Sequence, residues 1–200
     1  MSEPWLDPAL RESCRGQLAR ELMLRLVMHD VRNPLTPIVG ALEMMEMGGV
    51  EIPEYLTRSV QRLSGCLQAY SEFSWTRRAD VPPGAAINAV LGDIVVGGHH
   101  PLPLSPMRLV SALELARPLS VDIRPDPSHG WRVSVMGLSK AAVALAMAPR
   151  FEELSGRFHD PDPLAGAALL RAVAREAGGQ LGRVDGGTFP TTGLVMLLPG

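Results

Sequence analysis

Several features that mark particular protein classes are missing from this sequence. The longest apolar run is the stretch Ala141–Ala148, whereas a membrane helix needs about 18 consecutive apolar residues. The first residues, Met1–Trp5, have neither the basic start nor the apolar core of a signal peptide. These absences predict a cytoplasmic protein that does not bind a membrane.

The chain also lacks an excess of positive charge, and it has few cysteines. The chain has 19 Lys and Arg against 21 Asp and Glu, a formal charge of −2, and Lys140 is its single lysine. Without a basic stripe, bulk charge does not favour a nucleic-acid partner. Cys14 and Cys66 lack metal-ligand spacing, so we expect reduced packing residues.

Two stretches of apolar residues follow the 3.5-residue spacing of a helical bundle. One covers residues 24–45 and the other residues 56–70, with glycines and a proline between them. This pattern predicts an antiparallel helical hairpin. Because a hairpin cannot cover its own apolar stripe, we expect a second copy to complete a four-helix bundle.

Short strand and helix patterns take over after a Pro- and Gly-rich linker at residues 81–84, so we divide the chain into domains at 1–80 and 81–200. The mixture of strand and helix patterns in the second domain predicts an α+β fold with helices packed on one sheet. Strands are expected at 93–96, 121–124, 131–136, 180–184 and 193–198, and helices at 107–117, 139–148 and 164–177.

One motif on the first helix presents polar groups beside an apolar seam. Val31 and Leu35 fall on the seam, so His29 faces solvent, with Asn33 one turn further on the same face. An imidazole at neutral pH is largely uncharged and nucleophilic. Asp30 can hold the proton on one ring nitrogen and leave the other nitrogen free to attack a phosphoryl group.

Two prolines follow this histidine within the same helical pattern. Pro34 and Pro37 each remove a helix hydrogen bond and crowd the preceding turn, so a bend is predicted just past His29. An interior proline costs about 3 kcal/mol relative to alanine. Two of them, with Thr36 between, therefore point to a functional requirement.

The order His29, Asp30, Arg32, Asn33, then Pro-Leu-Thr resembles the H-box of sensor histidine kinases, in their dimerisation and histidine-phosphotransfer domain. Residues 164–199 are similar to the end of the kinase ATP-binding domain, with a Gly-rich helix start, Gly178-Gly179 and a last strand ending in Leu-Pro. The resemblance implies a dimeric four-helix bundle followed by a degenerate kinase-type, Bergerat-like α/β sandwich.

The chain departs from the family where nucleotide is bound. Residues 111–116 match the helix that carries the Mg²⁺-binding asparagine, and Leu115 stands in the place of that asparagine. From Ser128 to Phe151 there is no Asp, Glu or Asn to read adenine, and Gly166 alone is a weak phosphate cradle. We therefore expect no ATP, metal or other cofactor of its own.

These observations favour a histidine phosphotransferase of a bacterial two-component phosphorelay. In this hypothesis His29, Asp30 and Asn33 are catalytic, while Arg32, Pro34 and Thr36 support them. The partners are a second copy, the receiver domains of response regulators, which bring Mg²⁺, and an upstream hybrid histidine kinase. Autokinase activity from ATP is not expected.

Three alternatives stay open. A response-regulator phosphatase would use Asn33 to align water, and its activity could survive loss of His29. A divergent sensor kinase would label His29 from ATP alone. A non-catalytic pseudokinase scaffold would bind a receiver domain with unchanged affinity when His29 is replaced.

Overall fold

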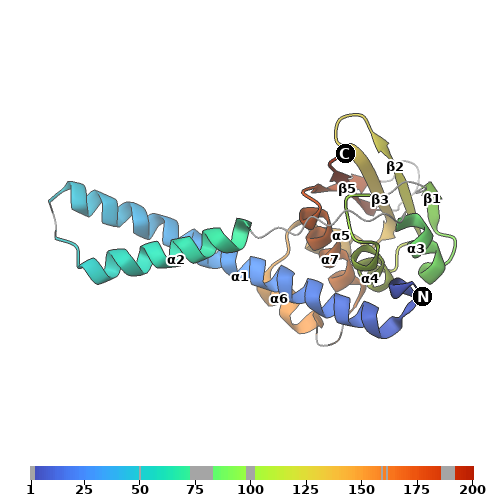
Figure 1. Ribbon diagram of the computed structural model, residues 1–200, viewed down its shortest axis with the longest axis horizontal. Coiled ribbons are helices and arrows are strands. Elements are labelled where there is room, and N and C mark those ends of the chain that lie inside the picture. Colours follow the sequence, from blue (N-terminus) through green and yellow to red (C-terminus); the bar gives the residue numbers. More distant parts are fainter. Residues whose placement is uncertain are drawn as a thin grey trace. The chain divides into compact units, whose positions relative to one another are not determined.

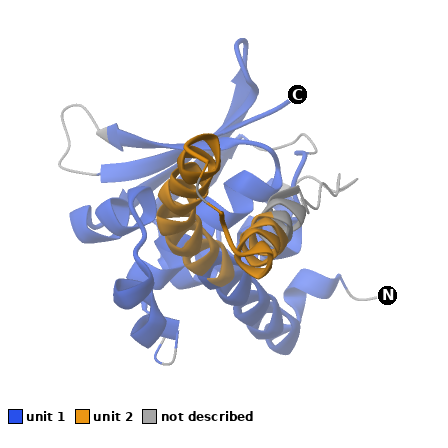
Figure 2. Ribbon diagram, turned by 90° about the vertical axis from the view of Figure 1, so that its left-hand side faces the viewer, with its two compact units in different colours: residues 1–23, 75–200 blue, residues 24–74 orange. Residues whose placement is uncertain are grey.

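The computed structural model divides the chain into two compact units, which are described separately (Figure 2). Unit 1 contains Met1–Met23 and Trp75–Gly200, and unit 2 is Leu24–Ser74. Of residues 65–72, 83 and 185 only the backbone is described. The structure as a whole describes residues 3–49, 51–72, 83–97, 102–158, 160, 162–185 and 192–200.

The first long helix, α1 (Pro8–Met47), runs from unit 1 into unit 2. It follows a short 3-10 turn, η1 (Pro4–Leu6), and begins where Asp7 Oδ1 accepts a hydrogen bond of 2.8 Å from the Ala9 amide. Proline suits the first position because no helix bond is required of it there. The helix ends at two glycines, the second of which has a φ of +73°.

Unit 2 is a helical hairpin. The second half of α1 and helix α2 (Glu54–Glu72) run antiparallel, joined by the segment around Gly49 and Pro53. Between them Leu35 is only 7% exposed, whereas Leu24, Ile38 and Met45 on the same predicted seam remain 45–47% exposed. The hairpin is therefore confirmed, and its apolar stripe is incompletely covered within one chain.

Unit 1 contains a five-stranded mixed sheet in the order β1-β2-β3-β5-β4. Strand β1 is parallel to β2, and the other neighbours are antiparallel (Figure 1). The strands are β1 (Val95–Gly97), β2 (Ser120–Asp126), β3 (Gly130–Leu138), β4 (Gln180–Asp185) and β5 (Thr192–Leu198).

Helices cover one face of this sheet and enclose the core. Alternate strand residues such as Ile123, Val133 and Met196 are fully or nearly fully buried and lie on one face by their register. Helix α7 packs against both α4 and α5. The remaining helices are α3 (Pro83–Leu91), α4 (Pro106–Ala116), α5 (Lys140–Met147), α6 (Phe151–Ser155), the 3-10 turn η2 (Gly156–Phe158) and α7 (Pro163–Glu176).

The α+β fold class and most of the elements predicted from the sequence agree with this architecture, with a few local exceptions, while the dimeric four-helix bundle stays a prediction. The region from Pro83 was interpreted as part of a linker but begins helix α3, and α6 was not predicted. The remainder of that linker, residues 81–82, lies outside the described residues. Residues 1–23, assigned by sequence to the helical domain, belong to the same compact unit as the sheet.

None of the described helices combines the length and the apolar character that a membrane span requires.

Glycine at the start of α7 allows a close helix contact. A Cβ added at Gly166 would lie 2.2 Å from the backbone nitrogen of Ala116, whereas one added at Gly16 would meet nothing within 4 Å. We expect Gly166→Ala to destabilise unit 1 by about 1–3 kcal/mol through overpacking. Gly16→Ala, its control in α1, should be neutral or stabilising by up to about 1 kcal/mol. Urea denaturation of both variants checks this, and equal effects would contradict the contact.

Candidate functional site

The predicted nucleophile lies on the exposed face of α1. The His29 side chain is 70% exposed and its neighbour Asp30 is 59% exposed, while Leu35 on the opposite face is buried. This arrangement confirms the exposure expected from the position of His29 beside the apolar seam. The imidazole is therefore accessible to a macromolecular partner.

Two side chains contact the same nitrogen of the ring. His29 Nδ1 lies 3.3 Å from Asp30 Oδ1 and 3.4 Å from Asn33 Nδ2. Neither contact involves Nε2, the nitrogen at the far edge of the ring. When Nδ1 carries the proton and donates it to the carboxylate, Nε2 bears a lone pair directed away from both neighbours.

The two prolines do not end the helix. Helix α1 continues through Pro34 and Pro37, although neither can donate a helix bond to the carbonyls of Asp30 and Asn33. Thr36 Oγ1 donates a hydrogen bond of 3.2 Å to the Arg32 carbonyl. The backbone acceptors beside His29 are consequently less saturated than in a regular helix, and the bend expected there stays a prediction.

A hollow of about 510 Å³ lies next to this motif within unit 2. Arg32 and Thr36 line it together with Gly40 and Glu43 on α1 and with Ser64 on α2. Two of the three supporting residues, Arg32 and Thr36, therefore face a concave surface about one and two turns beyond His29, whereas Pro34 does not line it. A partner that reaches His29 can also contact this surface.

In unit 1, helix α4 is contacted by charged side chains of the first half of α1. Arg11 Nε lies 3.0 Å and Arg15 Nη1 2.8 Å from Glu114 Oε2. Arg11 also donates a hydrogen bond of 2.6 Å to the Trp5 carbonyl. Glu114, the one acidic residue beside Leu115 on α4, thus has both carboxylate oxygens engaged by guanidinium groups.

One turn away, Cys14 of α1 faces the same surface of α4. Burial raises the pKa of the Cys14 thiol, and a hydrogen bond with Ser111 partly opposes that rise. Ser111 is fully buried, and its hydroxyl donates to the Met107 carbonyl at 2.7 Å. The thiol is therefore a packing group, as expected for Cys14; the side chain of Cys66 lies outside the described part of the chain.

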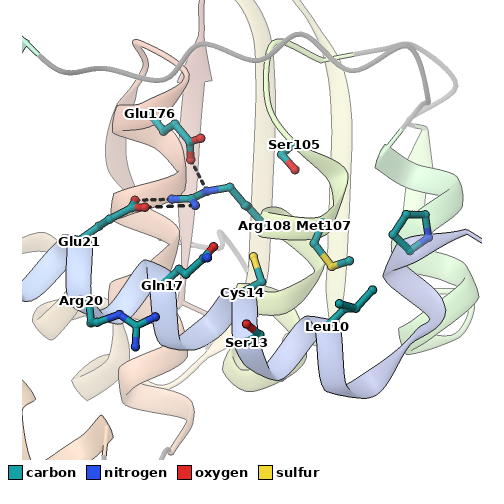
Figure 3. Close-up of a pocket in the computed structure, with 11 residues that line it drawn as sticks. Leu10, Ser13, Cys14, Gln17, Arg20, Glu21, Ser105, Met107, Arg108 and Glu176 are labelled. Carbon is teal, nitrogen blue, oxygen red and sulfur yellow. Dashed lines mark hydrogen bonds and ion pairs between the residues drawn. The ribbon is translucent and has the colours of Figure 1, made fainter.

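Cys14 also borders a hollow of about 750 Å³ in unit 1 (Figure 3). On its wall, Arg108 forms ion pairs with Glu21 and, at 2.5 Å from Nε to Oε2, with Glu176. Burial alone would lower the pKa of Arg108, but the Glu21 hydrogen bond and the Glu176 charge outweigh it and raise the pKa. The cluster joins α1, α4 and α7.

Sequence reasoning identified the histidine motif but missed this charged cluster. Charged residues in a helical pattern usually lie on the solvent-exposed face, and nothing in the local sequence distinguishes these four: Arg11, Arg15, Glu21 and Arg108. Glu114, the partner of both Arg11 and Arg15, lies about a hundred residues further along the chain. The available signal was the four-residue apolar spacing of Cys14, Leu18 and Leu22, which predicts a buried stripe on the first part of α1, separate from the seam that begins at Leu24.

Metal ligation finds no support among the side chains that are described. No three His, Cys, Asp or Glu side chains gather there as metal ligands would. His99, His100 and His159 lie outside the described residues.

Comparison with known proteins gives no family match. No family model matches the chain, and no curated protein is similar to it in sequence. Similar solved structures include a histidine kinase from Burkholderia phymatum STM815, at 17% identity and a TM-score of 0.48 over 100% of both chains.

Two further structures resemble the chain less closely. The histidine kinase domain of the Erythrobacter litoralis EL346 blue-light activated histidine kinase has 18% identity and a TM-score of 0.35 over 92% of this chain and 93% of its own. The Acinetobacter baumannii histidine kinase AdeS has 12% identity and a TM-score of 0.37 over 86% and 97%.

The Glu114 ion pairs can be tested against an exposed pair in the same unit. Replacing Glu114 by Gln leaves the guanidinium of Arg11, whose side chain is 9% exposed, without its charge partner. We expect a loss of about 1–3 kcal/mol in the free energy of unfolding. Glu153→Gln, which removes an exposed pair with Arg150 at 3.9 Å, should cost less than about 0.5 kcal/mol. Chemical denaturation distinguishes the two, and equal losses would refute a structural role for Glu114.

Proposed function

We propose that the chain is a histidine phosphotransferase that exchanges a phosphoryl group with aspartates of receiver domains through Nε2 of His29. The observation that carries this proposal is the exposed ring of His29, whose Nδ1 faces Asp30 while Nε2 points away from both neighbours. A nucleophile that serves another protein's active site has to be accessible in this way.

The transfer step balances without a cofactor on this chain. The Nε2 lone pair of His29 forms the N–P bond as the O–P bond of the aspartyl phosphate breaks, and the bonding electrons leave with the aspartate carboxylate. The proton stays on Nδ1, so the ring becomes positively charged. Asp30 stabilises that charge from 3.3 Å. Mg²⁺ bound by the receiver domain would offset charge on the transferred group.

Three features of unit 1 support a phosphoryl source outside the chain. On helix α4, Ser111 lies under Cys14, and Glu114 is engaged by Arg11 and Arg15. The start of α7 at Gly166 is in direct contact with the end of α4, which leaves no space for a phosphate between them. The strand β3 leads into α5 through Ser139, which caps the helix by accepting a bond from the Ala142 amide, and no carboxylate lies in between.

A second copy of the chain is proposed to complete the bundle. Leu24, Ile38 and Met45 form an exposed part of the seam on α1, and Leu63 on α2 is 41% exposed. Burial of a leucine or isoleucine side chain contributes about 1.5–3 kcal/mol, so pairing of two such hairpins would be favourable. The exposed apolar seam supports a homodimer in which each copy presents one His29.

The test offers phosphoryl groups from two sources to the purified chain. Receiver domains phosphorylated with labelled acetyl phosphate should transfer label to the protein, whereas labelled ATP alone should not. His29→Ala should abolish the transfer. His129→Ala is a matched control, because His129 is a partly exposed histidine whose Nδ1 also faces a carboxylate, that of Asp126 at 3.1 Å.

Other outcomes would identify the other functions. Label from ATP without a partner would indicate a kinase. Loss of receiver phosphate that persists in His29→Ala would indicate a phosphatase in which Asn33 aligns water. Receiver binding with neither reaction would indicate a scaffold.

A further inference from the structure

The imidazole of His29 has two neighbours that require opposite states of the same nitrogen. The Asp30 carboxylate accepts hydrogen bonds only, so its contact at 3.3 Å requires a proton on Nδ1. The Asn33 amide nitrogen donates only, so its contact at 3.4 Å requires a lone pair on Nδ1. One nitrogen of a neutral ring cannot satisfy both at once, and the two contacts are mutually exclusive.

Each contact corresponds to one tautomer of the neutral ring. With the proton on Nδ1, Asp30 is satisfied and Nε2 carries the lone pair needed for attack. With the proton on Nε2, Asn33 donates to Nδ1 and the exposed nitrogen has no lone pair to offer. The near-equal distances, 3.3 and 3.4 Å, place both partners within reach of the ring without a change of rotamer.

We propose that Asn33 is a positioning residue that restrains His29, because its amide stabilises the unreactive Nε2–H tautomer against the Asp30-bound reactive one. Asn33 therefore sets the fraction of His29 that is ready to accept a phosphoryl group. The effect on transfer rests on the phosphotransferase function proposed above, whereas the tautomer balance does not.

The rest of the chain supplies a reference histidine for this balance. His129 Nδ1 lies 3.1 Å from Asp126 Oδ1, and that hydrogen bond is the main reason that the pKa of Asp126 is lowered. His129 Nδ1 thus contacts a carboxylate, as His29 Nδ1 contacts Asp30. The two rings differ in the amide that faces His29 from one helical turn away.

The size of the effect of Asn33 on the transfer rate follows from the fractions of the two His29 tautomers. A reaction that uses one tautomer proceeds in proportion to the fraction of molecules in that tautomer. If the two tautomers of His29 were equally populated, removing the Asn33 amide would accelerate phosphoryl acceptance by at most about twofold. Replacing Asp30 by Asn would shift the population the other way and slow acceptance.

The tautomer of the His29 ring can be measured directly. Protein labelled with ¹⁵N-histidine is studied by NMR at alkaline pH, where neutral imidazoles show which nitrogen carries the proton through the shifts of Nδ1 and Nε2. Asn33→Ala and Asn33→Asp should both increase the Nδ1–H fraction of His29, and Asp30→Asn should decrease it. The shifts of His129 should not change in any variant.

Two results would overturn the proposal. An unchanged tautomer ratio in Asn33→Ala would show that the amide has no influence on the ring. A fall in the Nδ1–H fraction would show that Asn33 accepts from Nδ1 through its carbonyl oxygen and assists Asp30. Because alanine and aspartate at an exposed helix position preserve the helix, circular dichroism should match the parent chain.

Phosphoryl transfer measured on the same variants separates this inference from the proposed function. A shifted tautomer ratio without any transfer from receiver domains would refute the phosphotransferase and leave the role of Asn33 in place. Transfer to His29 with an unshifted tautomer ratio would support the phosphotransferase and refute the role of Asn33. Faster acceptance by Asn33→Ala, within about twofold, together with the shifted ratio supports both.

Discussion

Helix α1 is one continuous helix whose first part belongs to unit 1 and whose second part belongs to unit 2. Its first half is held in unit 1, where Leu18 and Leu22 are almost fully buried. Its second half belongs to unit 2 and carries His29 on an exposed face about two turns further along. An isolated helix owes little stability to propensity alone, so the packing at the start of α1 and the hairpin contact at Leu35 are what keep it ordered.

Two sets of ion pairs hold the helices of unit 1 together. Guanidinium groups of Arg11 and Arg15 neutralise Glu114, and Arg108 is neutralised by Glu21 and Glu176. These charges are used within the fold to fasten α1 to α4 and α7. In the proposed function, the exposed edge of the His29 imidazole meets its phosphoryl group on another protein.

The reactivity of that imidazole depends on neighbours rather than on burial. Asp30 and Asn33 are drawn to the same nitrogen of His29 at nearly equal distances. Because all three side chains lie at exposed positions, their interactions are weak and reversible, as the proposed acceptance and release of a phosphoryl group would require. The prolines that follow leave backbone carbonyls of the same residues without helix donors.

Local patterns accounted for most elements, and long-range packing accounted for the errors. The strands near Val133 and Leu194 and the hairpin were predictable because alternation and heptad spacing are properties of contiguous residues. Helix α3 was missed because Pro83 and Gly84 resemble a linker, although proline is also favoured at a helix start. The assignment of residues 1–23 to unit 1 depends on partners such as Glu114 that no local pattern reveals.

The sequence by itself determined the helix that carries His29, the exposure of that side chain, and the order of the strands and of the helices other than α3 and α6, because each depends on spacing along the chain. Only the tertiary structure decided that Arg11 and Arg15 meet Glu114, that α7 touches α4 at Gly166, and that Asp30 and Asn33 converge on one ring nitrogen. The physical reason is the same in each case. Contacts between side chains depend on distances and directions in space, which residue order constrains only within a turn or two of helix.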